Sequence, residues 1–354
     1  MPRILIAAGG TVGHVAPALA VADELRAQGA DVEFAGTPNR IEAELVPAHG
    51  YPFHPFRVSG IPRRVGVDAV KAVGRGIAAP VACSRIIAAV RPDAVFGAGG
   101  YVAGPMLAAA KRHRIPSALS EADARLGWAN RLAAPLVDRV FLAFPIAGRE
   151  PPRYLVTGRP VDRAFAATTR EEGRAALGID ADERVVVAFG GSLGAGPIND
   201  ALRGAYDDGV PVGQRVVLVT GRGKQRAGTP PERFDELEFT REMPALLAAA
   251  DVVVARSGGS VYEVAAAGRA AILVPWAGAA DDHQTLNARP FAAAGAAIVL
   301  PDASLTASGL REAIDRVLGD ADRRAGMEAA MRSLARPDAA REMAETLLDL
   351  AGRR

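Results

Sequence analysis

Short apolar runs alternate with longer amphipathic segments along this chain of 354 residues. Apolar runs bounded by Gly, Pro or polar residues predict strands, and apolar positions spaced three and four apart predict helices. In the first half, the predicted strands are Arg3–Ala7, Asp31–Ala35, Ala94–Phe96, Ser117–Leu119 and Arg139–Leu142, and the predicted helices are Ala16–Gln28, Arg40–Ala48, Val67–Val90 and Val102–Arg112. Pro80 predicts a break or kink in the third helix.

The second half repeats this pattern. Its predicted strands are Val185–Phe189, Arg215–Val219, Val252–Ala255, Ala271–Val274 and Ala297–Leu300, with a helix from about Ile198. Each half opens with an apolar strand, a Gly-Gly turn and a helix. The sequence therefore predicts an α/β protein with two Rossmann-like, doubly wound domains of similar size facing a cleft.

The boundary between the domains is expected near Phe144–Arg163, where Pro145, Pro151, Pro152, Gly158 and Pro160 interrupt helix and strand patterns alike. This gives a first domain over residues 1–160 and a second over 161–337. The last segment, Asp338–Leu350, has the pattern of an amphipathic helix. We expect this helix, at about 338–354, to pack back on the first domain.

Composition and charge indicate the cellular compartment of the protein and the kind of surface that it could bind. The single cysteine, Cys83, cannot form an internal disulfide, and we expect it to be buried. No apolar stretch approaches the ~20 residues of a membrane-spanning helix, and the apolar start is too short for a signal peptide, so we expect a cytoplasmic protein.

Positive charge gathers between Ile61 and Arg114, at Arg63, Arg64, Lys71, Arg75, Arg85, Arg91, Lys111, Arg112 and Arg114, against Asp68 and Asp93. This excess favours an anionic surface, either lipid headgroups or a polyphosphate, although an ordinary solvated helix face has the same pattern.

Three Gly-rich turns connect a predicted strand to a predicted helix, at Gly9–Gly13, Gly97–Pro105 and Gly190–Gly194. Such turns expose backbone N–H groups at the start of a helix and so favour phosphate, but glycine also serves turn geometry alone. None of them has the Lys-Ser/Thr of a Walker A loop or the spacing of a dinucleotide fingerprint. A nicotinamide cofactor is therefore disfavoured.

Two titratable residues next to these turns are candidates for chemistry. His14 lies in the first helical turn after Gly13, where the positive end of the helix disfavours imidazolium and suits a general base. Glu263 follows a Gly-rich turn early in a helix and could accept both hydroxyls of a ribose. A capping histidine and a solvated glutamate are the alternatives. No metal-ligand set is visible: Asp180 with Asp182, and Asp320 with Asp322, are interpreted as surface residues, and we expect no cofactor.

Taken together, the motifs resemble a known family. Gly9–Ala20, Gly97–Pro105, Gly190–Ala195, Arg256–Glu263 and Asp282–Ala288 occur in the order found in the MurG family, the N-acetylglucosaminyltransferases that act on lipid I. The similarity covers nearly the whole chain. It implies a GT-B fold with UDP-N-acetylglucosamine mainly on the second domain and lipid I on the first.

The resemblance also implies roles for individual residues. His14 would be the general base. Ser192, Ser260 and Val261 would meet the diphosphate, Glu263 the ribose, Gln284 and Asn287 the sugar hydroxyls, and Thr240 and Met243 the uracil. Thr11, Val12 and Gly13 would line the cleft above the donor. The other substrate-binding residues implied are Gly99, Gly100, Tyr101, Asp123, Asn130, Arg159, Leu193, Gly194, Ser257 and Gly259.

In this reading the C4 hydroxyl of N-acetylmuramic acid in lipid I attacks the anomeric carbon of UDP-N-acetylglucosamine with inversion, without a metal. The family further implies a peripheral protein on the cytoplasmic face of the inner membrane, held there by Val67–Val90 and the surrounding basic residues. Other cell-wall synthesis proteins are possible partners, and we expect no nucleic acid.

Three features depart from the family pattern. Val12 replaces a third glycine, and a positive φ there would be costly. Ser120-Glu121-Ala122-Asp123 replaces His-Glu-Gln-Asn, so Asp123 places a carboxylate where an amide is usual, and Arg256–Glu263 is one residue short of some members. The alternatives that stay open are a GT-B transferase with a different acceptor and a non-catalytic nucleotide-sugar-binding protein. A UDP-sugar 2-epimerase shares the fold, but its carboxylate-rich site is not apparent.

Overall fold

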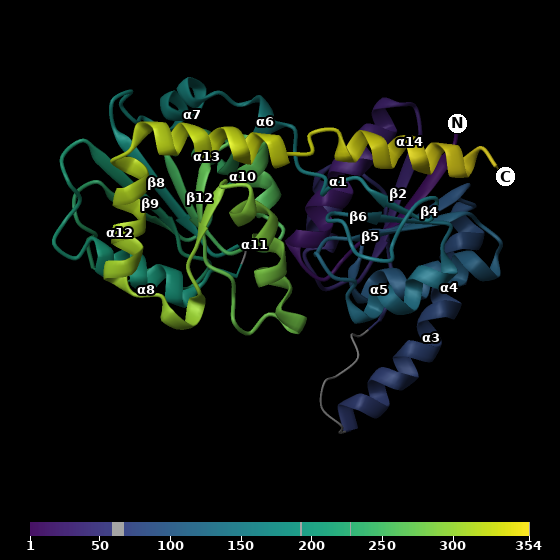
Figure 1. The fold of residues 1–354 in the computed structure, drawn as a ribbon. Helices are drawn as coiled ribbons and strands as arrows, with labels where there is room; N and C mark the ends of the chain where they lie inside the picture. Colours follow the sequence, from purple (N-terminus) through teal and green to yellow (C-terminus); the bar gives the residue numbers. More distant parts are fainter. Residues whose placement is uncertain (59–66, 192, 227, 354) are drawn as a thin grey trace. The chain divides into compact units, whose positions relative to one another are not determined.

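The chain folds into two compact units, Met1–Val161 with Asp338–Arg354 (unit 1) and Asp162–Pro337 (unit 2) (Figure 1). This is seen in a computed structural model that describes residues 1–58, 67–191, 193–226 and 228–353, with the backbone alone for 67–78 and Ala280. Each unit contains one sheet covered by helices. The predicted α/β architecture with two doubly wound halves is confirmed.

Unit 1 is built on a seven-stranded parallel sheet in the order β3-β2-β1-β4-β5-β6-β7. Its strands are β1 (Arg3–Ala7), β2 (Asp31–Gly36), β3 (Phe53–Pro55), β4 (Ala94–Gly97), β5 (Ser117–Glu121), β6 (Arg139–Leu142) and β7 (Tyr154–Val156). Side chains alternate across a strand, so Ile4 and Ile6 enter one hydrophobic core and Leu5 and Ala7 the other.

Helices cover both faces of this sheet. The core that contains Ile4 and Ile6 is closed by α1 (Val12–Ala27) and α14 (Ala339–Ala351), which lie side by side in Figure 1. The opposite core is closed by α3 (Val67–Val90) and α4 (Gly100–Arg112), with α5 (Trp128–Ala133) and the 3-10 turn η1 (Ala134–Leu136) beside α4. The short helix α2 (Glu42–Ala48) follows β2. Cys83 is fully buried, as predicted.

Unit 2 is built on a six-stranded parallel sheet in the order β10-β9-β8-β11-β12-β13. Its strands are β8 (Arg184–Phe189), β9 (Gln214–Val219), β10 (Phe234–Leu237), β11 (Val252–Ala255), β12 (Ala270–Leu273) and β13 (Ala297–Val299). Its helices are α6 (Ala164–Ala167), α7 (Arg170–Leu177), α8 (Gly196–Ala205), α9 (Met243–Ala249), α10 (Val261–Ala267), α11 (His283–Ala293), α12 (Ala307–Leu318) and α13 (Ala321–Leu334), with 3-10 turns η2 (Ala280–Asp282) and η3 (Asp302–Ser304).

A buried ion-pair network ties α7, β8, β11 and α13 together in unit 2. Asp251, just before β11, accepts the backbone N–H of Val185 at 2.8 Å and pairs with Arg174 at 3.0 Å and with Arg170. Arg170 also pairs with Glu328 of α13 at 2.8 Å. One carboxylate therefore satisfies a strand N–H and two guanidinium groups.

One sequence prediction about these elements was wrong, and another, a break or kink at Pro80, was wrong for the break. Strand β7 lies inside the Pro-rich segment that was expected to break strands, because its three residues pair with β6 at the sheet edge, where little pairing is needed. Helix α3 runs from Val67 to Val90 through Pro80 instead of breaking there. The interpretation of Asp180, Asp182, Asp320 and Asp322 as surface residues is confirmed. No helix within the described part of the chain has the length and apolar character needed to cross a membrane.

Candidate active site

Each sheet has one point at which its strand order reverses, and several of the predicted site residues lie there. In unit 1 this point lies between β1 and β4, and in unit 2 between β8 and β11. Chain segments leaving the carboxyl ends of two such strands diverge, which opens a crevice for ligands in doubly wound folds. The turns Gly9–Gly13 and Gly99–Gly100 leave β1 and β4, and the turns 190–194 and 256–260 leave β8 and β11.

His14 lies where the two turns of unit 1 meet. Its Nδ1 is 3.1 Å from the hydroxyl of Thr11, the residue that precedes α1. The other side of the ring faces the second turn: a Cβ on Gly99 would lie 3.1 Å from Cδ2 and 3.5 Å from Nε2. Gly99 and Gly100 have φ of 93° and 74°, a conformation that suits glycine. The structure thus brings the predicted residues Thr11, His14, Gly99 and Gly100 together.

The surroundings of His14 keep its imidazole neutral. Burial, and then the positive charge of Arg159, lower the pKa of His14 from 6.5 to about 4, against smaller opposing effects of Asp123 and Glu42. The Arg159 guanidinium donates to the carbonyl oxygen of Gly13, directly before His14. A neutral imidazole at pH 7 can accept a proton, as a general base must.

We expect the His14 ring to titrate with a pKa of about 4 in a ¹⁵N NMR titration of histidine-labelled protein, with the signal assigned by its loss in His14→Asn. The unfolded chain then binds this proton first, so unit 1 loses stability as the pH falls from about 6.5 to about 4 and keeps it above 6.5. The loss should reach about 3 kcal/mol at most, measured as the difference between wild type and His14→Asn. Titration of His14 at or above pH 6.5 would contradict the proposed environment.

The segment that departs from the family pattern forms a loop organised by Glu121, which sequence reasoning did not single out. The buried Glu121 carboxylate accepts the N–H groups of Asp123 and Gly127 at 3.1 and 2.8 Å and the amide of Asn130 at 2.8 Å. Burial raises the pKa of Glu121, while these hydrogen bonds lower it. The predicted substrate residue Asn130 is itself buried and also donates to Ser120 O, so its amide holds this loop in shape.

Val12 causes no backbone strain in this turn. It is the first residue of α1, and the left-handed conformation falls on Gly10, with φ of 100°. Two other predicted residues of this unit lie at this turn. Tyr101 is next to Gly10, since a Cβ on Gly10 would lie 3.2 Å from its ring, and Gly13 is exposed.

In unit 2, three predicted residues are joined by hydrogen bonds between the turn after β11 and the start of α11. The hydroxyl of Ser257 donates to Gln284 O at 2.8 Å, and the amide of Asn287 donates to Ser257 O at 3.1 Å. Gln284 Oε1 accepts the N–H of Trp276 at 2.9 Å, which leaves Nε2 directed toward Gly258. Asn287 is fully buried, so it supports Ser257, whereas Gln284 is partly exposed.

The remaining predicted residues of unit 2 lie at the same edge of its sheet. Ser260, Val261 and Glu263 form the start of α10, with Glu263 partly exposed, and Thr240 and Met243 precede and begin α9. Leu193 is exposed, whereas Gly194 packs closely against Thr220 and Gly221, so that a Cβ on Gly221 would come within 2.7 Å of the Gly194 backbone. Gly194 therefore serves packing. Ser192 lies outside the described residues.

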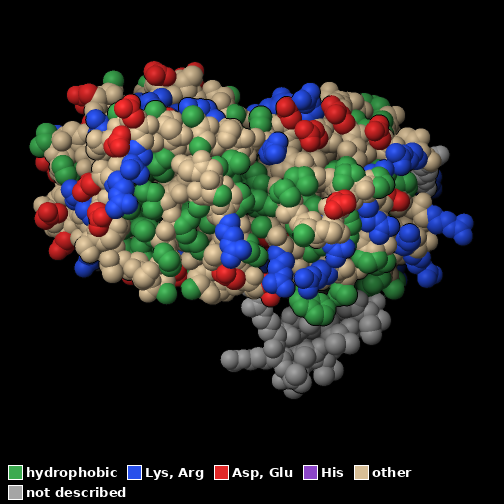
Figure 2. Space-filling model, in the orientation of Figure 1, with side chains coloured by type: hydrophobic (Ala, Val, Ile, Leu, Met, Phe, Trp, Pro, Cys, Tyr) green, Lys and Arg blue, Asp and Glu red, His purple; other side chains and the backbone are tan. Residues whose placement is uncertain are grey.

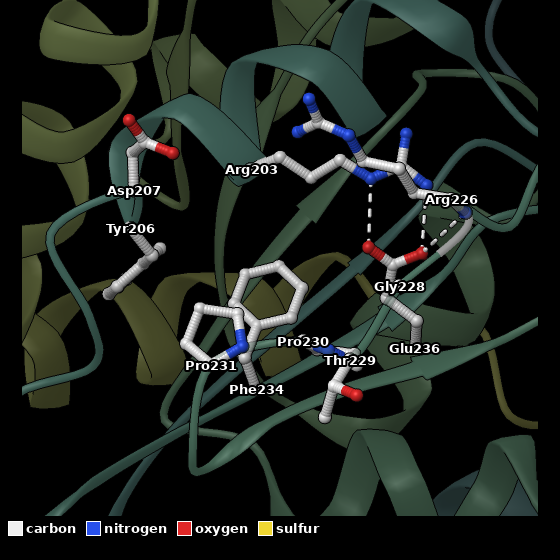
Figure 3. A pocket seen from close by; sticks show the side chains of 10 residues that line it. All are labelled: Arg203, Tyr206, Asp207, Arg226, Gly228, Thr229, Pro230, Pro231, Phe234 and Glu236. Carbon is white, nitrogen blue, oxygen red and sulfur yellow. Dashed lines mark hydrogen bonds and ion pairs between the residues drawn. The ribbon is translucent and has the colours of Figure 1, made fainter.

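A cavity of about 430 Å³ in unit 2 has none of the predicted site residues in its lining (Figure 3). It is lined by Arg203, Tyr206, Asp207, Arg226, Gly228, Thr229, Pro230, Pro231, Phe234 and Glu236. Arg203 is held by Glu236 through two hydrogen bonds of 2.8 Å, so its charge is already compensated. In the described parts of both units, no group of three or more His, Cys, Asp and Glu side chains is placed to hold a metal ion.

Two parallel-sheet Rossmann-like units, with candidate residues at both switch points, define the GT-B architecture. Residues 4–142 match the glycosyltransferase family 28 N-terminal domain, and residues 185–343 match the glycosyltransferase family 28 C-terminal domain. The chain therefore belongs to glycosyltransferase family 28.

Named relatives narrow the likeness further. A protein of Salinibacter ruber is 39% identical over 363 residues, covering 99% of this chain and 98% of its own, and one of Pseudomonas putida is 40% identical over 358 residues with the same coverage. Both are named UDP-N-acetylglucosamine–N-acetylmuramyl-(pentapeptide) pyrophosphoryl-undecaprenol N-acetylglucosamine transferase. The crystal structure of Acinetobacter baumannii MurG superposes with a TM-score of 0.78 at 28% identity, over 99% of this chain and 100% of that one. The calicheamicin glycosyltransferase CalG4, at 18% identity and a TM-score of 0.72 over 100% of this chain and 99% of that one, shares the fold.

Proposed function

We propose that this protein transfers N-acetylglucosamine from UDP-N-acetylglucosamine to the C4 hydroxyl of N-acetylmuramic acid in undecaprenyl-pyrophosphoryl-N-acetylmuramyl-pentapeptide. The product is lipid II, the disaccharide precursor of peptidoglycan. The observation that carries this proposal is the 39–40% identity to transferases of this name over 99% of the chain, which includes both units and both switch points. The presence of His14 and Glu263 argues against a non-catalytic binding protein.

The reaction uses His14 as the base. The C4 oxygen attacks the anomeric carbon, the bond from that carbon to the UDP oxygen breaks, and the hydroxyl proton moves to the imidazole. In this proposal Nδ1–H donates to the Thr11 hydroxyl, so Nε2 carries the free lone pair and accepts the proton. Gly99 lacks a side chain beside Nε2, which leaves room for the acceptor hydroxyl. An anionic substrate close to Arg159 would offset its positive charge and so raise the pKa of His14 toward the working pH.

Unit 2 supplies the donor contacts in this proposal. Gln284 Nε2 is directed toward Gly258, where it can donate to a sugar hydroxyl, because Trp276 N–H already occupies Oε1. Glu263 accepts the two ribose hydroxyls, and the backbone near Thr240 and Met243 faces the uracil. Backbone N–H groups of the Gly-rich turns stabilise the leaving diphosphate, so the reaction needs no metal.

The test is transfer of radiolabelled sugar from UDP-N-acetylglucosamine to a synthetic lipid I analogue, with EDTA present. We expect UDP release coupled to a β-1,4-linked disaccharide at an unchanged rate. Tight donor binding without transfer to this analogue would reject the proposed acceptor, and loss of the rate in EDTA would reject metal independence.

We also propose that the protein associates peripherally with the cytoplasmic face of the cell membrane through unit 1. Trp128 and Leu132, four residues apart on one face of α5, are 71% and 60% exposed. Arg125 and Arg131 beside them are exposed, and Val81 of α3 adds a third exposed apolar side chain. Figure 2 shows hydrophobic side chains next to Lys and Arg along the lower edge of this unit. Apolar side chains framed by positive charge suit an anionic lipid surface.

Of the basic segment predicted for this role, Arg63 and Arg64 lie outside the described residues, and so do the side chains of Lys71 and Arg75. Arg85, Arg91, Lys111, Arg112 and Arg114 are exposed. Among the residues whose side chains the structure describes, the proposed membrane contact therefore rests mainly on α5.

We expect the double substitution Trp128→Ser with Leu132→Ser to lower binding to phosphatidylglycerol-containing vesicles by at least 10-fold in a sedimentation assay. Burial of each apolar side chain contributes about 1.5–3 kcal/mol, more than a tenfold change requires. Val212→Ser in unit 2, where Val212 is 92% exposed, is the matched control and should bind normally. Equal binding of the double variant and the control would reject α5 as the contact.

A further inference from the structure

Glu42 is a fully buried carboxylate directly beneath the turn that precedes His14. It is the first residue of α2 and has 0% of its surface exposed. Its Oε2 accepts the backbone N–H of Gly10 at 3.1 Å, and its Oε1 accepts the N–H of Thr37 at 3.1 Å and also the Thr37 hydroxyl. Three donors therefore converge on one side chain that can only accept.

The surrounding sequence leaves space for this carboxylate at two glycines. A Cβ on Gly9 would overlap Glu42 Oε1, and a Cβ on Gly36 would lie 2.8 Å from Glu42 Cγ. Gly9 lies just after β1, at the start of the turn, and Gly36 is the last residue of β2. The carboxylate thus fills a gap between two adjacent strands and fixes the turn that leaves one of them.

The link from Glu42 to His14 is short. Gly10, which donates to Glu42, has φ of 100° and directs the chain into Thr11. The carbonyl of Thr11 accepts the N–H of His14 at 3.0 Å, and its hydroxyl contacts His14 Nδ1. A shift of Gly10 would therefore move both groups that orient the imidazole.

We propose that Glu42 is a positioning residue of the transfer reaction, which holds the Gly9–Gly10 turn so that Thr11 and His14 keep their places. The proposal rests on the proposed function for its kinetic consequence, but the geometry of the turn is independent of the acceptor. A misplacement of about 1 Å at a reacting group can lower a rate by about 100-fold.

The charge of Glu42 has a separate effect. With Asp123 it raises the pKa of His14, whereas burial and Arg159 lower it. Removal of the Glu42 charge should therefore lower the pKa of His14 further. Misplacement and altered basicity both act on the same imidazole, so the ring signal of His14 reports on them directly.

The experiment compares Glu42→Gln with Thr37→Val. In Glu42→Gln the amide NH₂ must face the N–H of either Gly10 or Thr37, so at least one backbone hydrogen bond to this side chain is lost and the turn keeps at most a neutral acceptor. Thr37→Val removes a hydroxyl bonded to the same carboxylate but keeps the bond from Gly10 to Glu42. Glu44→Gln, an exposed carboxylate on the same helix, is the surface control.

For Glu42→Gln we expect kcat to fall by about 10- to 100-fold, KM for UDP-N-acetylglucosamine to stay within about 3-fold, and the ¹⁵N signals of the His14 ring to shift with a lower pKa. Thr37→Val and Glu44→Gln should keep kcat and the ring signals near those of wild type, even if Thr37→Val is less stable. Should Glu42→Gln fail to fold, Glu42→Asp replaces it: its shorter side chain withdraws the carboxylate from Gly10, so kcat should fall and the ring signals should shift, but the charge is kept and the lower pKa is not expected.

The proposal is overturned if Glu42→Gln leaves the ring signals and kcat unchanged, or if Thr37→Val lowers kcat equally, since the role would then be stability alone. If wild type itself does not transfer sugar but the ring signals still respond to Glu42→Gln and not to Thr37→Val, the proposed function fails and the positioning of His14 by Glu42 stands.

Discussion

Replacement of His14 by alanine is expected to lower turnover by about two to four orders of magnitude, the range for loss of a general base. The imidazole is held neutral by burial and by Arg159, and Thr11 and Gly99 fix the direction of its two nitrogens. The measurement is the steady-state rate of sugar transfer at saturating donor and acceptor.

The control for this variant is twofold. UDP affinity, measured by calorimetry, should be unchanged, because the proposed nucleotide contacts belong to unit 2 and His14 to unit 1. His113→Ala, which removes an exposed histidine at the end of α4, should keep full turnover. Turnover of His14→Ala within threefold of wild type would exclude the imidazole as the base.

Asp251→Ala should be the most destabilising of the substitutions considered for unit 2, with a loss of about 3–5 kcal/mol in the free energy of unfolding. It leaves the N–H of Val185 without its acceptor and the buried guanidinium of Arg174 without its carboxylate. A buried charge stripped of its partner costs far more than an exposed pair contributes.

The two tryptophans of the chain allow this loss to be assigned to one unit, because Trp128 belongs to unit 1 and Trp276 to unit 2. Urea unfolding followed by fluorescence in a Trp128→Phe background reports on unit 2. The control is Asp315→Ala, which removes the exposed pair of Asp315 with Arg311 on α12 and should cost less than about 1 kcal/mol. A loss from Asp251→Ala no larger than that of the control would show that the network contributes little.

Strands that are buried on both faces could be predicted from the sequence almost to the residue. Arg3–Ala7, Arg139–Leu142 and Val252–Ala255 have the predicted bounds, because continuous apolar runs next to Gly or Pro leave few alternatives. Strand β10, with the sequence Phe-Asp-Glu-Leu, was missed since it lies at the sheet edge and carries charge. Strand β7 was missed because prolines around it favoured a linker.

The candidate site was predictable where local sequence carries the signal. Glycines next to strand ends pointed to both switch points, and His14 stood out because it follows one of them. Glu42 and Glu121 were missed because a carboxylate in an amphipathic segment has the pattern of a solvated residue. Only the converging N–H donors of Gly10, Thr37 and Gly127 show that these two are buried acceptors. Gly10 is distant from Glu42 in the sequence, and the donors Thr37 and Gly127, although nearby in the chain, converge only once the segments around them have folded.

The return of α14 to unit 1 has a consequence for synthesis of the chain. Met343, Ala344 and Leu347 of this helix complete the core beside α1, yet they are translated after all of unit 2. While the ribosome is making unit 2, α14 has not yet been synthesised, so the apolar face of α1 stays exposed to solvent. In most nascent chains, by contrast, the N-terminal domain folds before the later domains are made. We therefore expect unit 1 to depend on chaperones until α14 emerges, and chains that stop before Asp338 to be cleared by proteases.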